Sequence, residues 1–248
     1  MGNTTAKSML NCGMAIEELK SRVLRNQLYA NTLSALLLIN GILLFIVTFN
    51  NLLIVFTIAR TASLHRASNF LILGQSIADA FVGMIIQPSF CAMQFYEMNE
   101  VFPEYCQARF VYNAFGWCIC AVSFLTLTAL IADRFIALNY HLRYQQIVTN
   151  TRVGRLLLFI WCCGVLCGIL RLLTLIVITA FGRKTFPNYR VAFRVSESCV
   201  FLSSLLNPII YFWRIEQLRS AGVRIFRTVS WRLYSIMGNA NSRQVHPS

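Results

Sequence analysis

Apolar stretches long enough to cross a lipid bilayer dominate the chain, and short polar segments separate them. A transmembrane helix needs about 20 mostly apolar residues in a row. The clearest stretch, Ser34 to Ala59, contains no charged residue, and four more follow it. We therefore expect an all-α membrane protein with a transmembrane bundle over residues 34–213. Its five predicted spans lie at about residues 34–59, 70–95, 108–138, 155–181 and 192–213.

The composition agrees with this pattern. The chain has 248 residues, of which 57% are hydrophobic and 12% are charged. Its mean hydropathy of +0.60 is higher than that of ordinary soluble domains. The formal net charge of +13 could indicate nucleic-acid binding, but no basic block is interleaved with aromatic residues. We expect membrane lipid as a partner and no nucleic acid.

The basic residues predict the orientation of the chain, because Lys and Arg concentrate in cytoplasmic loops. With residues 1–33 outside, the inner segments hold 11 Lys and Arg and the outer segments hold 8. We expect a multi-pass plasma-membrane protein with residues 214–248 in the cytoplasm. Asn3 begins a glycosylation triplet that would lie outside. The first 33 residues show no cleavable signal peptide, so the first span is expected to act as its own signal.

Polar residues inside the spans are candidates for function. An ionisable group in the hydrocarbon layer is costly unless it faces the interior of the bundle. Asp79 lies near the middle of the second span, Asn51 lies in the first, and Asn207 precedes Pro208 in the last. Because Pro208 frees a backbone carbonyl in a helix interior, a buried polar network is expected around it.

An acid and an arginine are adjacent at the inner end of the third span. Asp133 and Arg134 can form a local ion pair that persists until another group draws the arginine away. The alternative is an interfacial ion pair that only anchors the helix. Both interpretations fit the local sequence.

Five motifs occur together in one order along the chain. They are Asn51, Asp79, the triplet Asp133-Arg134-Phe135, Trp161, and the motif from Asn207 and Pro208 to Tyr211. In order and spacing they resemble the motifs of the rhodopsin-like (class A) G-protein-coupled receptors, and the resemblance covers roughly residues 34–230.

The resemblance implies a sodium ion between the second, third and last helices. The matching positions are Asp79, Ser123, Ser204 and Asn207, and Asn51 would hydrogen-bond to them. All four side chains carry oxygen, which suits a hard cation. The alternative is a polar network without an ion. No other metal and no other cofactor is expected.

The resemblance also implies an activation switch at the inner face. Arg134 would leave Asp133 and meet a heterotrimeric G protein, and Phe135 replaces the more common tyrosine. Tyr211, after Pro208, would move inward on activation. Residues 214–227 resemble the short membrane-surface helix of the family, with Ile215, Leu218, Ile225 and Phe226 roughly on one face.

Two positions bear on the outer half. Gly116 stands where amine receptors carry an aspartate, so we do not expect a biogenic amine bound in the usual way, and the extracellular ligand stays unknown. Cys106 is a candidate for an outer disulfide with an unidentified partner. No cysteine occurs between Cys167 and Cys199, and the family disulfide to the loop after the fourth helix is therefore not expected.

The chain departs from the family after the fourth span. Only 46 positions separate Trp161 from Asn207, and a fifth helix, a loop and a sixth helix do not fit into that length. The resemblance therefore predicts a rhodopsin-like bundle with five spans instead of seven. Losing two helices leaves the orientation of the last span unchanged.

Three functions follow as hypotheses. The first is G-protein-coupled receptor activity, with signal transduction in any full-length form. The second is a truncated, non-signalling protein that pairs with full-length receptors and modulates them. The third is a small transporter or channel with Asp79 as a pathway residue, but no inverted repeat supports the transporter. An enzyme is not expected, because no nucleophile with its base and no metal motif occurs.

Overall fold

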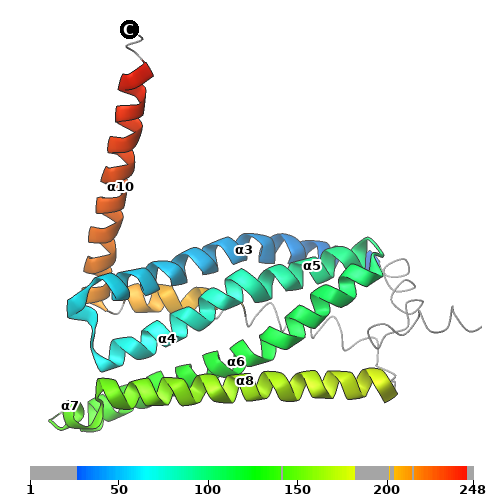
Figure 1. Ribbon diagram of the computed structural model, residues 1–248, viewed down its shortest axis with the longest axis horizontal. Helices are drawn as coiled ribbons and strands as arrows, with labels where there is room; N and C mark the ends of the chain where they lie inside the picture. The colour runs from blue at the N-terminus through cyan, green and yellow to red at the C-terminus, as the bar shows by residue number, and fades with distance from the viewer. Residues whose placement is uncertain (1–26, 141, 182–200, 202–203, 214, 245–248) are drawn as a thin grey trace, which may run out of the picture.

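Four long helices lie side by side in an elongated bundle (Figure 1). The computed structural model describes residues 27–140, 142–181, 201, 204–213 and 215–244. The first long helix is α3 (Gln27–Arg60), and the short η1 (Ala62–Leu64) leads from it to the second. The last two are α6 (Phe102–Asn139) and α8 (Asn150–Phe181), joined by the one-turn helix α7 (Tyr144–Ile147). Residues 204–213 form a helix that contacts α3 and α4.

The second long helix is continuous but changes its winding. It consists of α4 (Ala67–Phe81), a π-helical turn η2 (Val82–Ile86) and α5 (Gln87–Met98). Pro88 stands at the start of α5 and has no amide hydrogen to donate to the turn before it. A wider turn directly before a proline accommodates this missing hydrogen bond. Asp79 therefore lies in the last turn of α4, just before the helix changes its winding.

Within the described residues, four helices are long and apolar enough to cross a membrane. They are Ala30–Arg60, Ala67–Met98, Pro103–Asn139 and Asn150–Thr174. The expected all-α membrane bundle is confirmed, and these helices overlap the first four predicted spans. Half of the fifth predicted span, 192–213, lies outside the described residues, and residues 204–213 are helical.

Two larger apolar clusters hold the described helices together, and a smaller one at Met93 and Tyr105 joins α5 to α6. The first lies at the end of the bundle that carries Arg134 and draws Ile54, Leu71, Leu130 and Leu218 from four different helices. The second lies farther along the bundle and is centred on Phe90, which is fully buried. The ring of Phe90 meets that of Phe201 edge to face at 5.3 Å between centroids. Exposed apolar side chains cover the outer faces of α3, α6 and α8, as expected for helices that face lipid.

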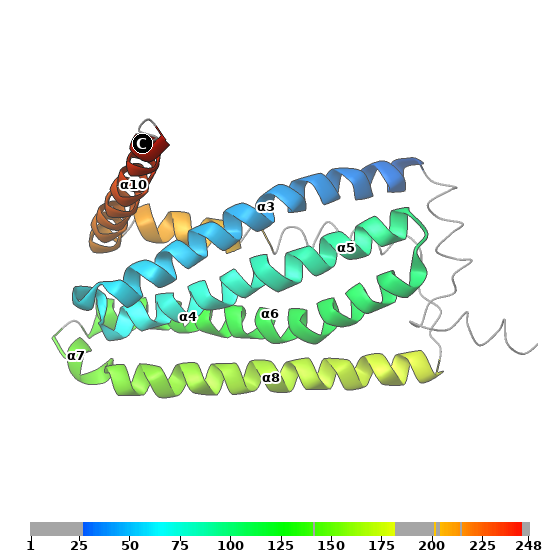
Figure 2. The ribbon, with the colours of Figure 1, turned by 45° about the horizontal axis from the view of Figure 1, so that its top comes forward.

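The C-terminal helix α10 (Glu216–Gln244) leaves the bundle at the Arg134 end and runs roughly across its axis (Figures 1 and 2). It is longer than the surface helix expected over residues 214–227. Leu218 is buried in the first apolar cluster, whereas Phe226 is 62% exposed. The apolar face expected from the sequence therefore divides between the bundle and its surroundings.

Small residues allow α6 and α8 to approach closely. A Cβ atom added at Gly164 would overlap the side chain of Val122 and lie 2.9 Å from the carbonyl oxygen of Cys118. One added at Gly168 would lie 3.1 Å from the Cβ of Cys118. The spacing of the two glycines matches the small-xxx-small pattern, which lets membrane helices gain dispersion contacts that larger residues prevent. This interface therefore depends on the absence of side chains at these positions.

We predict that Gly164→Ala destabilises the protein and Gly154→Ala does not. Both glycines lie in α8, but a Cβ at Gly154 would meet nothing within 4 Å. Overpacking at Gly164 is expected to cost about 1–3 kcal/mol of unfolding free energy. Thermal unfolding of the two purified variants in the same detergent measures the difference. Equal melting temperatures would show that the α6–α8 approach is not tightly packed.

Candidate functional site

The carboxylate of Asp79 lies at the centre of a buried hydrogen-bond network. The residue is fully buried in α4. Its Oδ1 accepts hydrogen bonds from the hydroxyls of Ser204 at 2.8 Å and Ser123 at 3.4 Å. Its Oδ2 accepts from Nδ2 of Asn207 at 2.8 Å and from Nε2 of Gln75 at 3.2 Å. The structure thus brings together all four residues that the sequence singled out, and adds Gln75.

Asn51 connects this network to α3. Its Nδ2 donates to the carbonyl oxygen of Ser204 at 3.1 Å and to that of Val47, in its own helix, at 2.9 Å. Asn51 therefore joins the cluster through the backbone of Ser204 and has no direct bond to the carboxylate in the structure. The first, second and third long helices and the 204–213 helix all meet at this point.

Gln75 is a member of the network that the sequence reasoning did not assign. It precedes Asp79 by one helical turn, a spacing that places two side chains on the same helix face. Its Nε2 also lies 2.6 Å from the hydroxyl oxygen of Ser123 on α6. That i, i+4 spacing of an amide and an acid inside an apolar span was the available signal.

Pro208 and Tyr211 follow Asn207 in the same helix. Pro208 is buried, and the ring of Tyr211 packs against the first apolar cluster. The hydroxyl of Tyr211 is buried without a hydrogen-bond partner among the described residues. The structure therefore places Tyr211 between the two polar sites but does not bond it to either.

Asp133 is held in place from two other elements. Its side chain is only 2% exposed. The hydroxyl of Ser68, at the start of α4, donates to its Oδ2 at 2.9 Å, and that of Tyr144, in α7, donates to its Oδ1 at 2.6 Å. Two short hydrogen bonds to a carboxylate are stronger than bonds between neutral groups. The acid is therefore satisfied largely without its neighbouring arginine.

Arg134 is only loosely paired. Its Nε lies 3.9 Å from Oδ2 of Asp133, at the outer limit of an ion pair, and its side chain is 55% exposed. The neighbouring Phe135 is 63% exposed and points away from the bundle core. A pair of this length with one exposed partner contributes little stability. The guanidinium of Arg134 is therefore largely accessible in the structure.

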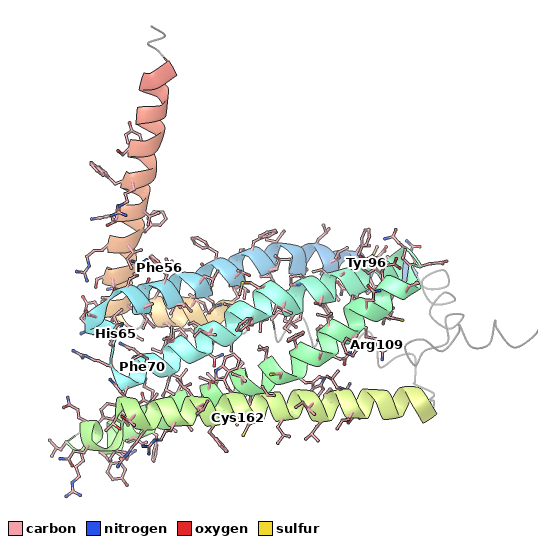
Figure 3. All side chains as sticks on the ribbon, in the orientation of Figure 1. Phe56, His65, Phe70, Tyr96, Arg109 and Cys162 are labelled. Atoms are coloured by element: carbon pink, nitrogen blue, oxygen red, sulfur yellow. The ribbon has the colours of Figure 1, made fainter. Side chains whose placement is uncertain are left out.

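A cavity of about 950 Å³ opens beside Arg134. Its wall includes Arg66 and Ser68 from the start of the second helix, Tyr144 from α7, and Glu216 from α10. His65, labelled in Figure 3 near Phe70, lines it as well. Its ring lies 6.2 Å from that of Phe70 between centroids. The cavity thus presents mainly cationic and neutral polar side chains.

Of two other predicted residues, Cys106 lies in α6 and Asn3 lies outside the described residues. Cys106 is disulfide-bonded, and its partner is outside the described residues. The prediction that Cys106 does not pair with a cysteine in the loop after the fourth helix stays untested. Within the described part, no group of His, Cys, Asp and Glu side chains could hold a metal ion.

Comparison with known proteins identifies the family. Residues 50–180, more than half of the chain, match the 7 transmembrane receptor (rhodopsin family). The chain belongs to this family. The matched region contains Asn51, Asp79, Asp133 and Arg134, so the residues of both polar sites fall largely within it.

The relatives of this rhodopsin-family chain are receptors. It is 32% identical over 118 residues to trace amine-associated receptor 365 of Petromyzon marinus, which covers 48% of the chain and 32% of that receptor. It is 28% identical over 127 residues to the alpha-1A adrenergic receptor of Oryctolagus cuniculus, covering 50% of the chain and 26% of the receptor. It is 27% identical over 121 residues to melanocortin receptor 5 of Sus scrofa, covering 48% and 41%. The matched part thus spans about a quarter to two fifths of these relatives.

We predict that Tyr144→Phe destabilises the Arg134 end of this receptor-family chain. Losing the hydrogen bond to the buried Asp133 is expected to cost about 1–2 kcal/mol of unfolding free energy. Tyr140→Phe is the matched control, because Tyr140 is 54% exposed. Chemical denaturation of both variants measures the difference, and equal losses would contradict the role of Tyr144.

The same contact has a pH dependence. Burial, followed by the hydrogen bond to Asp133, raises the pKa of the Tyr144 hydroxyl from 10.0 to about 12. Because the folded-state pKa is the higher one, the stabilisation is fully present below about pH 10 and is lost as the pH rises through about 12. The Tyr144→Phe variant is expected to lose this component of the alkaline transition.

Proposed function

We propose that this chain carries the G-protein-coupling face of a rhodopsin-like receptor and that, in the full-length form, it transduces a signal to a heterotrimeric G protein. The observation that carries this proposal is the state of Arg134. Asp133 is satisfied by Ser68 and Tyr144, so the arginine needs to give up only a 3.9 Å contact to engage a partner. An exposed guanidinium at a cavity wall can donate several hydrogen bonds to carbonyl or carboxylate oxygens of a docking helix.

The proposed location is the plasma membrane, with the Arg134 end in the cytoplasm. The excess of Lys and Arg in the segments on that side supports this orientation. Arg60, Arg66, Arg143, Arg152 and Arg219 all lie at or near the Arg134 end of the described helices. In this orientation the cavity beside Arg134 faces the compartment that contains the G protein.

The extracellular ligand is proposed to be something other than an amine held by an acid at position 116. By name, two of the three relatives above are trace amine and adrenergic receptors and one is a melanocortin receptor. Gly116 offers no carboxylate to an ammonium group. The nearest atom to a Cβ added there is Cγ2 of Ile86 at 4.0 Å, so packing does not require glycine at this position. Packing would therefore allow a side chain at position 116, and its absence removes the carboxylate that an ammonium group would need.

An Arg134→Ala variant tests the coupling proposal. The full chain and the variant are expressed in cells with a tagged G-protein α subunit, and proximity is measured by resonance energy transfer. We expect the variant to lose about tenfold in apparent affinity, equivalent to about 1.4 kcal/mol. Arg155→Ala is the control. Arg155 lies in α8 at the Arg134 end of the bundle but does not line the cavity. Equal signals from all three proteins would contradict the proposal.

A second candidate function is pairing with full-length receptors, and a stripe on α6 favours it. Large apolar side chains recur there at intervals of three and four residues, so they lie on one helix face. All are exposed by 41% or more. The α6 stripe consists of Phe124, Leu127, Ile131, Phe135 and Leu138. Lipid can cover such a face, but so can a helix of another receptor chain.

Co-expression with a trace amine-associated receptor tests this second function. The double variant Leu127→Ala with Ile131→Ala is expected to reduce energy transfer between the two proteins by about half or more, because it removes dispersion contacts at the centre of the stripe. Ile42→Ala with Phe45→Ala is the control, since these exposed residues lie on α3. Unchanged transfer and unchanged surface abundance of the receptor would contradict pairing through α6.

A further inference from the structure

The amide of Gln75 lies where a cation would have to bind. A cation held by Asp79 and Ser123 must contact oxygen atoms of both side chains. In the structure a single nitrogen, Nε2 of Gln75, already makes both contacts, at 3.2 Å to Oδ2 of Asp79 and 2.6 Å to the hydroxyl of Ser123. Gln75 is fully buried, so water does not compete for these contacts.

The hydrogen bonds around Asp79 are complete without an ion. An ionised carboxylate has two oxygens with about four lone-pair positions. Each oxygen of Asp79 accepts two hydrogen bonds, from Ser204 and Ser123 at Oδ1 and from Asn207 and Gln75 at Oδ2. The lone-pair positions of the Asp79 carboxylate are therefore already filled by side-chain donors, and none is left for a cation.

The direction of the Gln75 amide follows from the same chemistry. A carboxylate only accepts, so the group 3.2 Å from it must be the NH₂ of the amide. Ser123 then accepts from Nε2 with its oxygen and donates its own proton to Oδ1 of Asp79. Each proton that Gln75 and Ser123 donate in these three hydrogen bonds therefore has one acceptor. The Oε1 atom of Gln75 has no partner among the described residues, which agrees with an amide fixed by its nitrogen.

We propose that Gln75 replaces the sodium ion at the Asp79 site, so that this chain folds and remains stable independently of sodium. The amide supplies the partial positive charge that the carboxylate needs, and it is tied covalently to the same helix. The consequence for a receptor is a bundle whose conformational equilibrium does not respond to extracellular sodium. This property belongs to the folded bundle and does not depend on whether the chain signals.

The test compares thermal unfolding of the purified chain in sodium chloride and in choline chloride at equal ionic strength. The wild-type melting temperature is expected to be the same in both salts. Gln75→Leu removes the donor and leaves Asp79 with an unfilled position beside Ser123. This variant is expected to gain a saturable sodium response of about 3 °C or more. The double variant Gln75→Leu with Asp79→Asn is expected to lose that response.

A matched control is available in the same long helix. Gln87 is also fully buried, and neither polar atom of its amide has a hydrogen-bond partner in the described structure. Gln87→Leu is therefore expected to remain insensitive to sodium. A gain of sodium response in this control as well would show that the effect is not specific to Gln75, and would overturn the proposal.

Two further results would overturn it. One is a saturable stabilisation of the wild type by sodium that disappears in Asp79→Ala. The other is a folded Gln75→Leu protein that, like the wild type, does not respond to sodium. If Gln75→Leu does not fold, Gln75→Ala is used, and sodium-23 NMR line widths of the wild type still decide. Line broadening by the wild-type chain that vanishes in Asp79→Ala contradicts the proposal, and its absence supports it.

Discussion

The structure depends on one buried carboxylate. An ionised group in the interior of a membrane bundle is stable only where the protein provides the hydrogen bonds that water would have made. Asp79 receives four such bonds, and their donors come from α4, α6 and the 204–213 helix. These elements are constrained to meet at one point, because losing any of them leaves part of the charge without a partner. Asn51 extends the same constraint to α3 through the backbone of Ser204.

A second buried carboxylate, that of Asp133, is stabilised differently at the Arg134 end of the bundle. Asp133 is almost fully buried, and its donors are the hydroxyls of Ser68 and Tyr144. Because these two neutral groups hold the acid, the adjacent arginine is left loosely paired and exposed at a cavity. At Asp79 the hydrogen-bond donors fill every lone-pair position of the carboxylate. At Asp133 the donors replace Arg134 as partners of the carboxylate, so the guanidinium stays accessible. The first arrangement satisfies the carboxylate completely, and the second leaves the guanidinium available for the coupling proposed above.

Helix packing connects these two sites. In a membrane the approach of two helices is stabilised by close contact more than by the hydrophobic effect. Gly164 and Gly168 bring α8 onto α6, and α6 carries both Ser123 and Asp133. The position of α6 relative to α4 then decides whether Ser123 reaches Asp79 and whether Ser68 reaches Asp133. Glycines with no polar chemistry of their own therefore help to set the geometry of both polar sites.

The sequence by itself determined the class of the protein. Apolar stretches of about 20 residues can be stable only as membrane helices, and they predicted the all-α bundle. The family was indicated by resemblance, because its motifs match the order and spacing of Asn51, Asp79, Asp133, Arg134 and Asn207. The extent of α10 was not predicted, since an amphipathic pattern shows a helix face but not where the helix ends.

Only the tertiary structure decided which polar groups meet. Gln75 and Tyr144 belong to no sequence motif. Their roles are visible only in the folded chain, where Gln75 reaches Ser123 on α6 and Tyr144 on α7 reaches Asp133. A spacing of four residues could place Gln75 on the face of Asp79, but it could not show that its nitrogen reaches Ser123, 48 positions along the chain. The sequence lists the donors and acceptors, whereas their pairing depends on helix positions that packing sets to a fraction of an ångström.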